Sequence, residues 1–345
     1  MRLRDFQSYL NQNQIDLAFL VHPDLAITYF TQFKPSFAYL LISSRYASIY
    51  LTKLDPHSKI NSIKVETFPK NWEEHLSDFK IKRVGINIDS LTVKFLDKLK
   101  KIYPKAQFVD ISSKLKQLRE SKTSEEVQLI SKACKITSTA FSRLVDELPL
   151  GRLKTERDVS LFLERHIKDN QADLAFPTIV AMGKNAAIPH HITSTQKLRR
   201  GFLVLDFGAC YNNYCADMTR VIFLGQPTAK EKSFYDLLLA SQLQAVREVA
   251  LGRNFLDLDQ VVRAKLGKYS SHFIHSLGHG IGLEVHEDPS FGDGAAVKLN
   301  QTFTIEPGIY FPHKFGLRIE DTLHFDQKTK ILTTATKDLF KINLT

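Results

Sequence analysis

The sequence predicts an α/β domain over residues 1–118, followed by an α+β domain over residues 119–345. The length of 345 residues exceeds the roughly 250–300 residues at which a single hydrophobic core stops growing. The first part alternates helix and strand patterns, whereas the second part has longer helical patterns between strand-like segments. A polar stretch, SSKLKQLRESKT at 112–123, separates the two parts, and we expect the domain boundary near residue 118.

In the first domain, short runs of apolar, β-branched and aromatic residues indicate the strands. These runs are LAFLV at 17–21, SFAYLLI at 36–42, YASIYL at 46–51, VGINI at 84–88 and AQFVDI at 106–111. Helical periodicity is expected near 2–12 and at 91–102.

In the second domain, the first helix has a clear start signal. Thr123 and Glu126 form a capping box, because the threonine hydroxyl can accept the N3 amide while the glutamate reaches back. Helices are expected at 124–144, 155–170, 229–250 and 255–267, and strands at 176–182, 201–210, 214–224, 301–310 and 316–325.

The composition is that of an ordinary globular protein, with 43% hydrophobic and 24% charged residues. The net charge of +10 is concentrated in the first third, where residues 1–118 hold 18 Lys and Arg against 11 Asp and Glu. These lysines are scattered, with no compact basic run interleaved with aromatic residues. The charge therefore indicates a solvated surface, and nucleic acid is not an expected partner.

Nothing in the sequence indicates secretion or a membrane. The early apolar run at 17–21 is interrupted by His22 and Pro23, so it is shorter than a secretory h-region of about 7–15 residues. No run approaches the roughly 18 apolar residues that span a bilayer. Three cysteines are too few for a disulfide framework, so a cytosolic protein is expected.

The stretch HSLGHGIGLEVHEDP, at 275–289, contains three histidines. His275 and His279 are four residues apart, as in the helical pair of a zinc protease. However, no glutamate follows His275, and the three glycines at 278, 280 and 282 disfavour a helix by about 1 kcal/mol each. The histidines therefore need partners from elsewhere in the chain.

Two aspartates in LVLDFGACYNNYCADMTRVI supply such partners. Asn212-Asn213 is a hairpin-turn signal, because asparagine tolerates the positive φ of primed turns. In that register Asp206 and Asp217 are diagonal neighbours on one face, about 7–8 Å apart. Buried there without a partner they would cost several kcal/mol, so the pair indicates a metal site. The register also places Cys210 opposite Cys215, and we interpret these two as small buried residues rather than a redox pair.

Two more carboxylates lie in probable core strands. Glu306 follows Ile305, and Glu320 follows Ile319, where an acid is costly unless a cation neutralises it. Arg318 could neutralise Glu320 across one strand face, but it cannot satisfy four acids. The candidate ligands form an oxygen-rich set that suits two divalent cations of the manganese or cobalt kind: Asp206, Asp217, His279, Glu306 and Glu320.

These residues resemble the pita-bread metallopeptidases, in the Xaa-Pro branch of aminopeptidase P and prolidase. The resemblance covers the second domain through five motifs in the family order, while the first domain resembles the creatinase-like N-terminal domain of the same branch. The motifs are FPTIVAMGKNAAIPHH, LDFGACYNNYCADMTR, HSLGHGIGLEVHEDP, TIEPGIYFP and GLRIED. The resemblance implies a creatinase-like α/β domain followed by an α+β pita-bread catalytic domain, a homodimer, and two divalent metal ions, Mn²⁺ before Co²⁺ or Zn²⁺.

The resemblance also implies roles for individual residues. It makes Asp206, Asp217, His279, Glu306 and Glu320 the metal ligands. It assigns His190 and His286 to substrate contact and proton transfer, Glu306 to the catalytic proton, and His275 and Arg318 to the substrate side of the site. A metal-bridging hydroxide would attack the carbonyl before proline in the peptide substrate.

Ser290, just beyond the third motif, favours one activity within the branch. Prolidases tend to carry an arginine at that position to hold the free carboxylate of a dipeptide, and serine cannot make that bidentate contact. The sequence therefore predicts an Xaa-Pro aminopeptidase, with a prolidase as the alternative. A creatinase-like hydrolase is disfavoured because the metal ligands are present. A non-catalytic homologue that binds a protein or nucleic acid is a remote alternative.

Overall fold

The computed structural model describes residues 2–77, 81–292 and 294–343. The chain forms two compact units, Met1–Arg119 and Glu120–Thr345. Within the described ranges, no helix is both long enough and apolar enough to cross a membrane.

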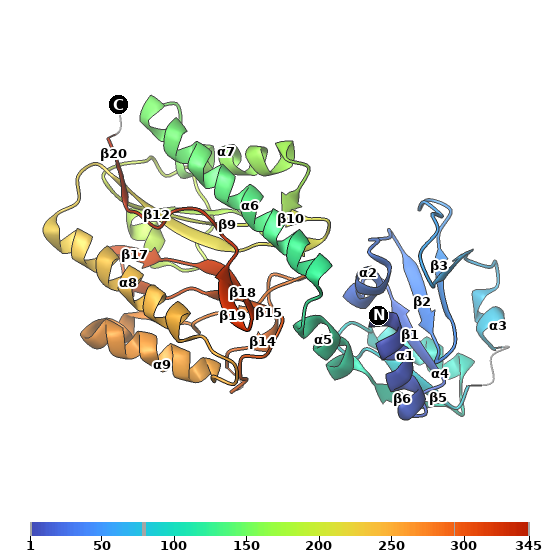
Figure 1. Cartoon of the computed structure of the whole chain (residues 1–345). Coiled ribbons are helices and arrows are strands. Elements are labelled where there is room, and N and C mark those ends of the chain that lie inside the picture. Colours follow the sequence, from blue (N-terminus) through green and yellow to red (C-terminus); the bar gives the residue numbers. More distant parts are fainter. Residues whose placement is uncertain (1, 78–80, 293, 344–345) are drawn as a thin grey trace. The chain divides into compact units, whose positions relative to one another are not determined.

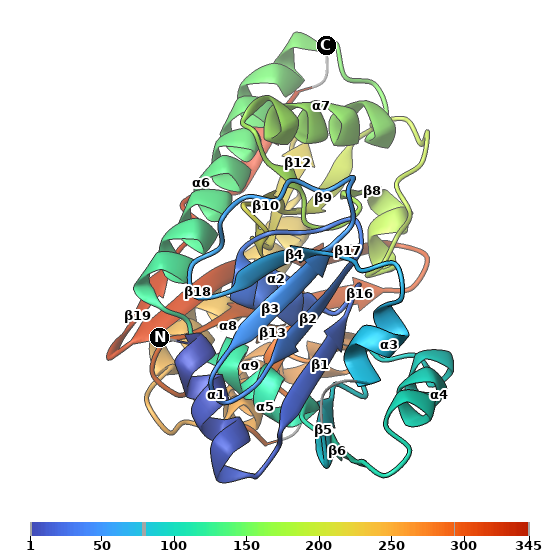
Figure 2. The same cartoon turned by 90° about the vertical axis from the view of Figure 1, so that its right-hand side faces the viewer.

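The first unit is built on a six-stranded mixed sheet in the order β4-β3-β2-β1-β5-β6. The central strands β1, β2 and β3 pair antiparallel, and β4, β5 and β6 join parallel to their neighbours. Figure 2 shows the three central strands side by side. Their bounds are β1 Leu17–Val21, β2 Ala38–Ile42, β3 Ala47–Leu51, β4 Lys64–Thr67, β5 Arg83–Ile86 and β6 Gln107–Asp110.

Helices cover both faces of this sheet, which explains why LAFLV is a continuous apolar run. Ala18 and Leu20 pack with α1, α2 and α5, whereas Leu17 and Phe19 pack on the other face with α3 and α4. The helices are α1 Arg2–Gln12, α2 Leu25–Thr31, α3 Trp72–Ser77, α4 Val93–Ile102 and α5 Ser112–Glu120. The sequence analysis missed α2, α3, α5 and β4, all of which are too short for a reliable periodic signal.

The second unit contains the four expected helices. They are α6 Ser124–Glu147, α7 Glu156–Asp169, α8 Ala229–Glu248 and α9 Phe255–Leu266. The Thr123–Glu126 capping box forms at the start of α6. Figure 1 shows the strands of this unit between α6 and α7 on one side and α8 and α9 on the other.

The strands of the second unit form four small sheets, in the orders β20-β12-β9-β8, β14-β13-β15-β18-β19, β11-β10-β7 and β16-β17. The bounds up to the middle of the unit are β7 Asp173–Leu174, β8 Ile179–Met182, β9 Gly201–Phe207, β10 Ala209–Tyr211, β11 Tyr214–Cys215 and β12 Met218–Leu224. Those that follow are β13 His279–Gly280, β14 Glu287–Ser290, β15 Gln301–Ile305, β16 Gly308–Phe311, β17 Phe315–Arg318, β18 Asp321–Asp326, β19 Lys328–Ile331 and β20 Phe340–Ile342.

Four segments predicted as continuous strands are each divided in two. The breaks lie at Gly208, at Ala216-Asp217, at Glu306-Pro307 and at Ile319-Glu320. The expectation of continuity was wrong because each segment leaves one sheet and enters another at the break. Three of the candidate metal ligands lie at these breaks.

The predicted hairpin register is confirmed. Cys210 pairs with Cys215, and Asp206 pairs with Thr219, in the same register. Asn212 and Asn213 form the turn with φ values of 46° and 71°. At Gly208 the strands approach so closely that a Cβ would lie 1.8 Å from the Ala216 carbonyl oxygen, which explains the glycine.

Candidate metal centre and active site

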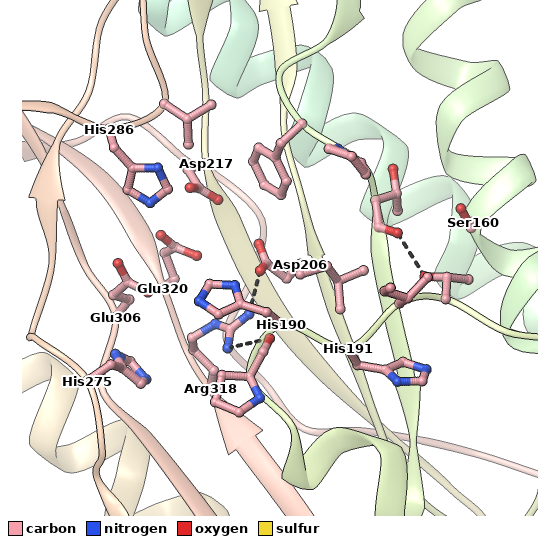
Figure 3. Close-up of a pocket in the computed structure, with 18 of the residues that line it drawn as sticks. Ser160, His190, His191, Asp206, Asp217, His275, His286, Glu306, Arg318 and Glu320 are labelled. Carbon is pink, nitrogen blue, oxygen red and sulfur yellow. Dashed lines mark hydrogen bonds and ion pairs between the residues drawn. The ribbon is translucent and has the colours of Figure 1, made fainter. Parts of the chain in front are cut away.

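A cavity of about 680 Å³ lies in the second unit. All nine candidate site residues line it: His190, Asp206, Asp217, His275, His279, His286, Glu306, Arg318 and Glu320. Figure 3 labels all of them except His279. They come from all five sequence motifs, so the fold brings together residues that lie up to 130 positions apart in sequence, from His190 to Glu320.

Four carboxylates converge at one end of this cavity. Asp206 is the next-to-last residue of β9, Asp217 and Glu320 lie at strand breaks, and Glu306 follows β15. Asp206, Asp217 and Glu320 are 7%, 5% and 1% exposed. One oxygen of each of these three is buried without a hydrogen-bond partner in the described structure, namely Asp206 Oδ1, Asp217 Oδ1 and Glu320 Oε1.

His279 adds the imidazole to this cluster. Its Nε2 lies 3.1 Å from Glu306 Oε1 and 3.7 Å from Asp217 Oδ2. Ligand atoms of Asp217, His279 and Glu320 all lie within 4.8 Å of one another. The adjacent Gly278 permits this approach, because a Cβ there would lie 2.1 Å from the Thr304 carbonyl oxygen. The glycines of the third motif therefore serve close strand packing.

The proton affinities reflect this crowding. Burial and the charges of neighbouring carboxylates raise the pKa of Asp217 and of Glu320 well above their ordinary values. Burial also acts to raise the pKa of Glu306, but the hydrogen bond and charge of His279 outweigh it and lower that pKa to about 2. Burial opposes protonation of His279, and Glu306 nevertheless raises its pKa.

This donor set fits divalent cations. Buried oxygens without partners are costly, and several carboxylates at close range repel one another unless a cation lies among them. Carboxylate oxygens with one imidazole are ligands that manganese and related metals accept. The five residues predicted from the sequence are the donors that could hold such ions.

Arg318 organises the other side of the cluster. It is 5% exposed, and its Nη2 pairs with Asp206 Oδ2. Its Nε donates to Thr219 Oγ1 at 3.0 Å, and the Thr219 hydroxyl donates to Glu320 Oε2 at 2.7 Å. The sequence offered Arg318 as a neutralising partner of Glu320. Its charge does act to lower the pKa of Glu320, but its direct ion pair is with Asp206, and Thr219 lies between it and Glu320.

Tyr310 connects this arginine to His275. Its hydroxyl accepts from Arg318 Nη1 at 2.8 Å and lies 2.9 Å from His275 Nε2. Burial is the main cause that lowers the pKa of His275. The sequence analysis missed Tyr310 and Thr219. Their only sequence signal was their place within the fourth and second motifs.

The remaining histidines differ in their surroundings. His190 and His286 face the cavity (Figure 3) and are exposed. The His286 ring centroid lies 4.1 Å from that of His279, and burial and the neighbouring His279 lower the pKa of His286. His191, the next residue after His190, lies 3.0 Å from Glu156 Oε2.

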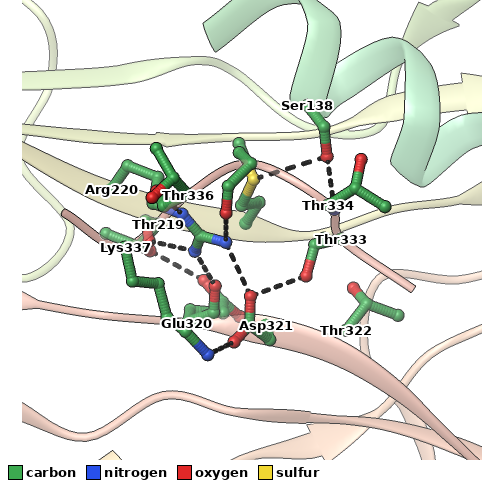
Figure 4. Close-up of polar contacts among 12 residues, drawn as sticks. Ser138, Thr219, Arg220, Glu320, Asp321, Thr322, Thr333, Thr334, Thr336 and Lys337 are labelled. Carbon is green, nitrogen blue, oxygen red and sulfur yellow. Dashed lines mark hydrogen bonds and ion pairs between the residues drawn. The ribbon is translucent and has the colours of Figure 1, made fainter. Parts of the chain in front are cut away.

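A buried ion pair lies next to the backbone of Glu320 (Figure 4). Arg220 and Asp321 are 1% and 0% exposed, and they pair at 2.7 Å. Arg220 also donates to the backbone oxygen of Glu320, and Lys337 binds the other oxygen of Asp321 at 2.6 Å. These contacts fix the backbone from which Glu320 projects.

Comparison with known proteins places this site in a family. Residues 128–327 match metallopeptidase family M24. The chain belongs to this family. Residues 2–121 match the creatinase/prolidase N-terminal domain, so the resemblance noted from the motifs is confirmed for both parts of the M24 peptidase.

Full-length relatives include Xaa-Pro peptidases. An Xaa-Pro dipeptidase of Pyrococcus furiosus is 34% identical to this M24 peptidase, over 98% of this chain and 99% of the relative. The prolidase structure from Pyrococcus horikoshii has a TM-score of 0.90 at 33% identity, over 98% of this chain and 99% of that one. An X-Pro aminopeptidase structure from Thermotoga maritima has a TM-score of 0.88 at 32% identity, over 95% and 98%. The chain therefore has the pita-bread fold of metal-dependent Xaa-Pro peptidases.

Proposed function

We propose that this M24 peptidase is an Xaa-Pro dipeptidase that requires two divalent metal ions. The observation that carries the proposal is the 34% identity to the Xaa-Pro dipeptidase of Pyrococcus furiosus over 98% of the chain. The preference for an aminopeptidase, predicted from Ser290, is less well supported by the relatives. Ser290 is also not among the residues that line the described cavity.

The metal ligands in this proposal are Asp206, Asp217, His279, Glu306 and Glu320. Two divalent cations such as Mn²⁺, held by these residues, would supply Lewis acidity and lower the pKa of water. The chain's own contribution is to hold the five donor groups in fixed places. Arg318 and Thr219 do this for Asp206 and Glu320, and Thr304 Oγ1 donates to Glu306 Oε1 at 3.1 Å.

The proton transfers fall to Glu306 and the cavity histidines. The carboxylate of Glu306 accepts a proton from the attacking water, as a general base. The lowered pKa of His286 keeps its ring neutral near pH 7, so that its N–H can donate to the substrate carbonyl oxygen as negative charge develops. We assign His190 to substrate contact. Glu306 then passes the proton that it took from the water to the proline nitrogen, which leaves as the amine.

A dipeptide substrate also has a free carboxylate, which must lie away from the acidic cluster. Two arginines, and no lysine, line the described wall of the cavity. Arg318 is engaged by Asp206, Thr219 and Tyr310. Arg157, in the first turn of α7, is exposed to the cavity. We assign the substrate carboxylate to Arg157.

The deciding experiment compares two substrates with Mn²⁺-loaded protein. An Xaa-Pro dipeptide should be hydrolysed with a higher kcat/KM than the corresponding Xaa-Pro-Xaa tripeptide. Faster cleavage of the tripeptide would establish the aminopeptidase, the second candidate, which the similarity to the Thermotoga maritima X-Pro aminopeptidase structure favours. If neither substrate is cleaved faster by wild type than by Asp217→Asn, the peptidase proposal is wrong.

A further inference from the structure

Glu156 is a buried carboxylate outside the metal cluster. It is the first residue of α7, and it is 0% exposed. The helix does not need this carboxylate to begin, because Thr155 and Asp158 form the capping box. A carboxylate taken so far from water must therefore be explained by what its oxygens bind.

Both oxygens of Glu156 bind one loop. Its contacts lie within residues 182–194, the segment that carries His190. Oε1 accepts from Met182 N at 2.7 Å and from Asn185 Nδ2 at 2.8 Å. Oε2 accepts from Ser194 N at 3.1 Å and from Ser194 Oγ at 2.6 Å, and it lies 3.0 Å from His191 Nε2.

These contacts favour the ionised carboxylate. Burial acts to raise the pKa of Glu156, but the hydrogen bonds from Ser194, Asn185, Met182 and His191 outweigh it and lower the pKa below its usual value. One charged group thus ties the start, the middle and the end of the loop to α7. Hydrogen bonds to a charged group are among the stronger ones in proteins.

His190 depends on this loop for its position. Among the described residues, no hydrogen bond or ion pair holds the His190 side chain, although the ring lines the cavity (Figure 3). Its direction is therefore set by its backbone. Other contacts also hold this loop: Arg318 Nη1 lies 3.5 Å from the Pro189 carbonyl oxygen, and Thr193 Oγ1 binds Thr178 and Val180 at 2.8 Å. Glu156 differs from them in binding residues on both sides of His190, including its neighbour His191.

We propose that Glu156 is a positioning residue for the Xaa-Pro hydrolysis, holding loop 182–194 so that His190 stays directed at the substrate. This inference rests on the proposed function, because the role of His190 is part of it. Glu156 itself touches neither the substrate nor the metal ligands. A shift of about 1 Å in a group that contacts substrate can lower the rate a hundredfold, so the loop's anchor matters for catalysis.

The test is Glu156→Gln, alone and combined with His190→Ala. Glutamine keeps the shape but replaces an acceptor oxygen with an NH₂ donor, which then faces the loop's own donors. In the otherwise wild-type protein we expect kcat/KM for an Xaa-Pro dipeptide to fall about tenfold to a hundredfold. In the His190→Ala background the same substitution should change kcat/KM by less than about threefold, because the group that it positions is gone.

Glu126→Gln is the matched control. Glu126 is also a buried glutamate in the first turn of a helix, where it accepts from Tyr214 Oη at 2.7 Å. Its substitution should lower the melting temperature without any coupling to His190. Amide hydrogen exchange supplies a second readout: Glu156→Gln should speed exchange within 182–194, and Glu126→Gln should not.

An equal loss of activity from Glu156→Gln in both backgrounds would show a general structural role and overturn the inference. So would unchanged exchange in the loop. If Glu156→Gln does not fold, Ser194→Ala removes one of the contacts and should show a smaller loss with the same coupling to His190. If wild type cleaves no Xaa-Pro peptide, the proposed function fails, whereas an active wild type without coupling overturns the role of Glu156 alone.

Discussion

Removing one carboxylate from the metal cluster should make the metal-free protein more stable. Asp217 is the appropriate residue. Among the residues that the structure describes, its Oδ1 is buried without a hydrogen-bond partner, and its Oδ2 lies 3.7 Å from His279 Nε2. Asp206 and Glu320 are better compensated, by Arg318 and Thr219. Asp217→Asn keeps the size of the side chain and removes its charge.

The expected magnitude follows from the burial of that charge. An unsatisfied buried polar group lowers the free energy of unfolding by about 1–3 kcal/mol. Each unit by which folding raises the pKa of a carboxyl group lowers it by about 1.4 kcal/mol, at a pH above both the folded and the unfolded pKa. A gain of about 2 kcal/mol corresponds to a rise in Tm of roughly 4–8 °C for a domain of 150–250 residues. The unit that carries the cluster, Glu120–Thr345, is in this range.

The sign of the pH dependence follows from the raised pKa. Between the ordinary pKa and the raised one, the folded metal-free protein keeps a proton that the unfolded chain has released. Stability from these groups therefore falls as pH rises. The Tm advantage of Asp217→Asn over wild type should be larger at pH 7.5 than at pH 5. Mn²⁺ should reverse the order, because it stabilises only the protein that binds it.

The assay is thermal unfolding of chelator-treated protein at both pH values, with and without Mn²⁺. Asp236→Asn is the control, because Asp236 is an exposed helical residue paired with Lys232, and it should change Tm by little in every condition. Two results would refute the reasoning that the carboxylates repel one another until cations bind among them. One is a lower Tm for metal-free Asp217→Asn than for wild type at pH 7.5, and the other is an equal Tm gain from Mn²⁺ in both proteins.

Three further substitutions test other parts of the site. Arg157→Gln should raise KM for an Xaa-Pro dipeptide about tenfold or more, because it removes a charged contact of about 1.5–3 kcal/mol. It should leave KM for the C-terminal amide of the same dipeptide unchanged. Equal effects on the acid and the amide would show that Arg157 does not bind the carboxylate. Arg220→Met leaves Asp321 buried without its arginine, so the free energy of unfolding, measured in urea at pH 7, should fall by about 3–5 kcal/mol. Because the pKa of Asp321 is lowered to about 2 in the folded wild type, this difference should diminish as the pH falls toward 2. Replacing Cys210 and Cys215 together by alanine should leave kcat/KM within about threefold. The hydrogen bond with Cys210 and burial raise the pKa of Cys215, which makes the thiol unreactive. A larger loss in steady-state assays would contradict the interpretation of these cysteines as packing residues.

Local signals in the sequence were sufficient for several parts of this protein. The Thr123–Glu126 capping box predicted the start of α6, and Asn212-Asn213 predicted both the turn and the pairing of Asp206 with Thr219. Such features depend on neighbours within a few residues, whose propensities act before any tertiary contact forms. The ligand set was also predictable, since acids within apolar strands require compensation wherever those strands lie.

Only the tertiary structure decided where the strands break and which groups support the ligands. A strand leaves one sheet for another according to partners far away in sequence, so the breaks at Asp217, Glu306 and Glu320 left no local pattern. The contacts of Tyr310 with His275 and of Glu156 with Ser194 span 35 and 38 positions. Their partners are set by the packing of whole elements, and residue periodicity carries no information about such pairs.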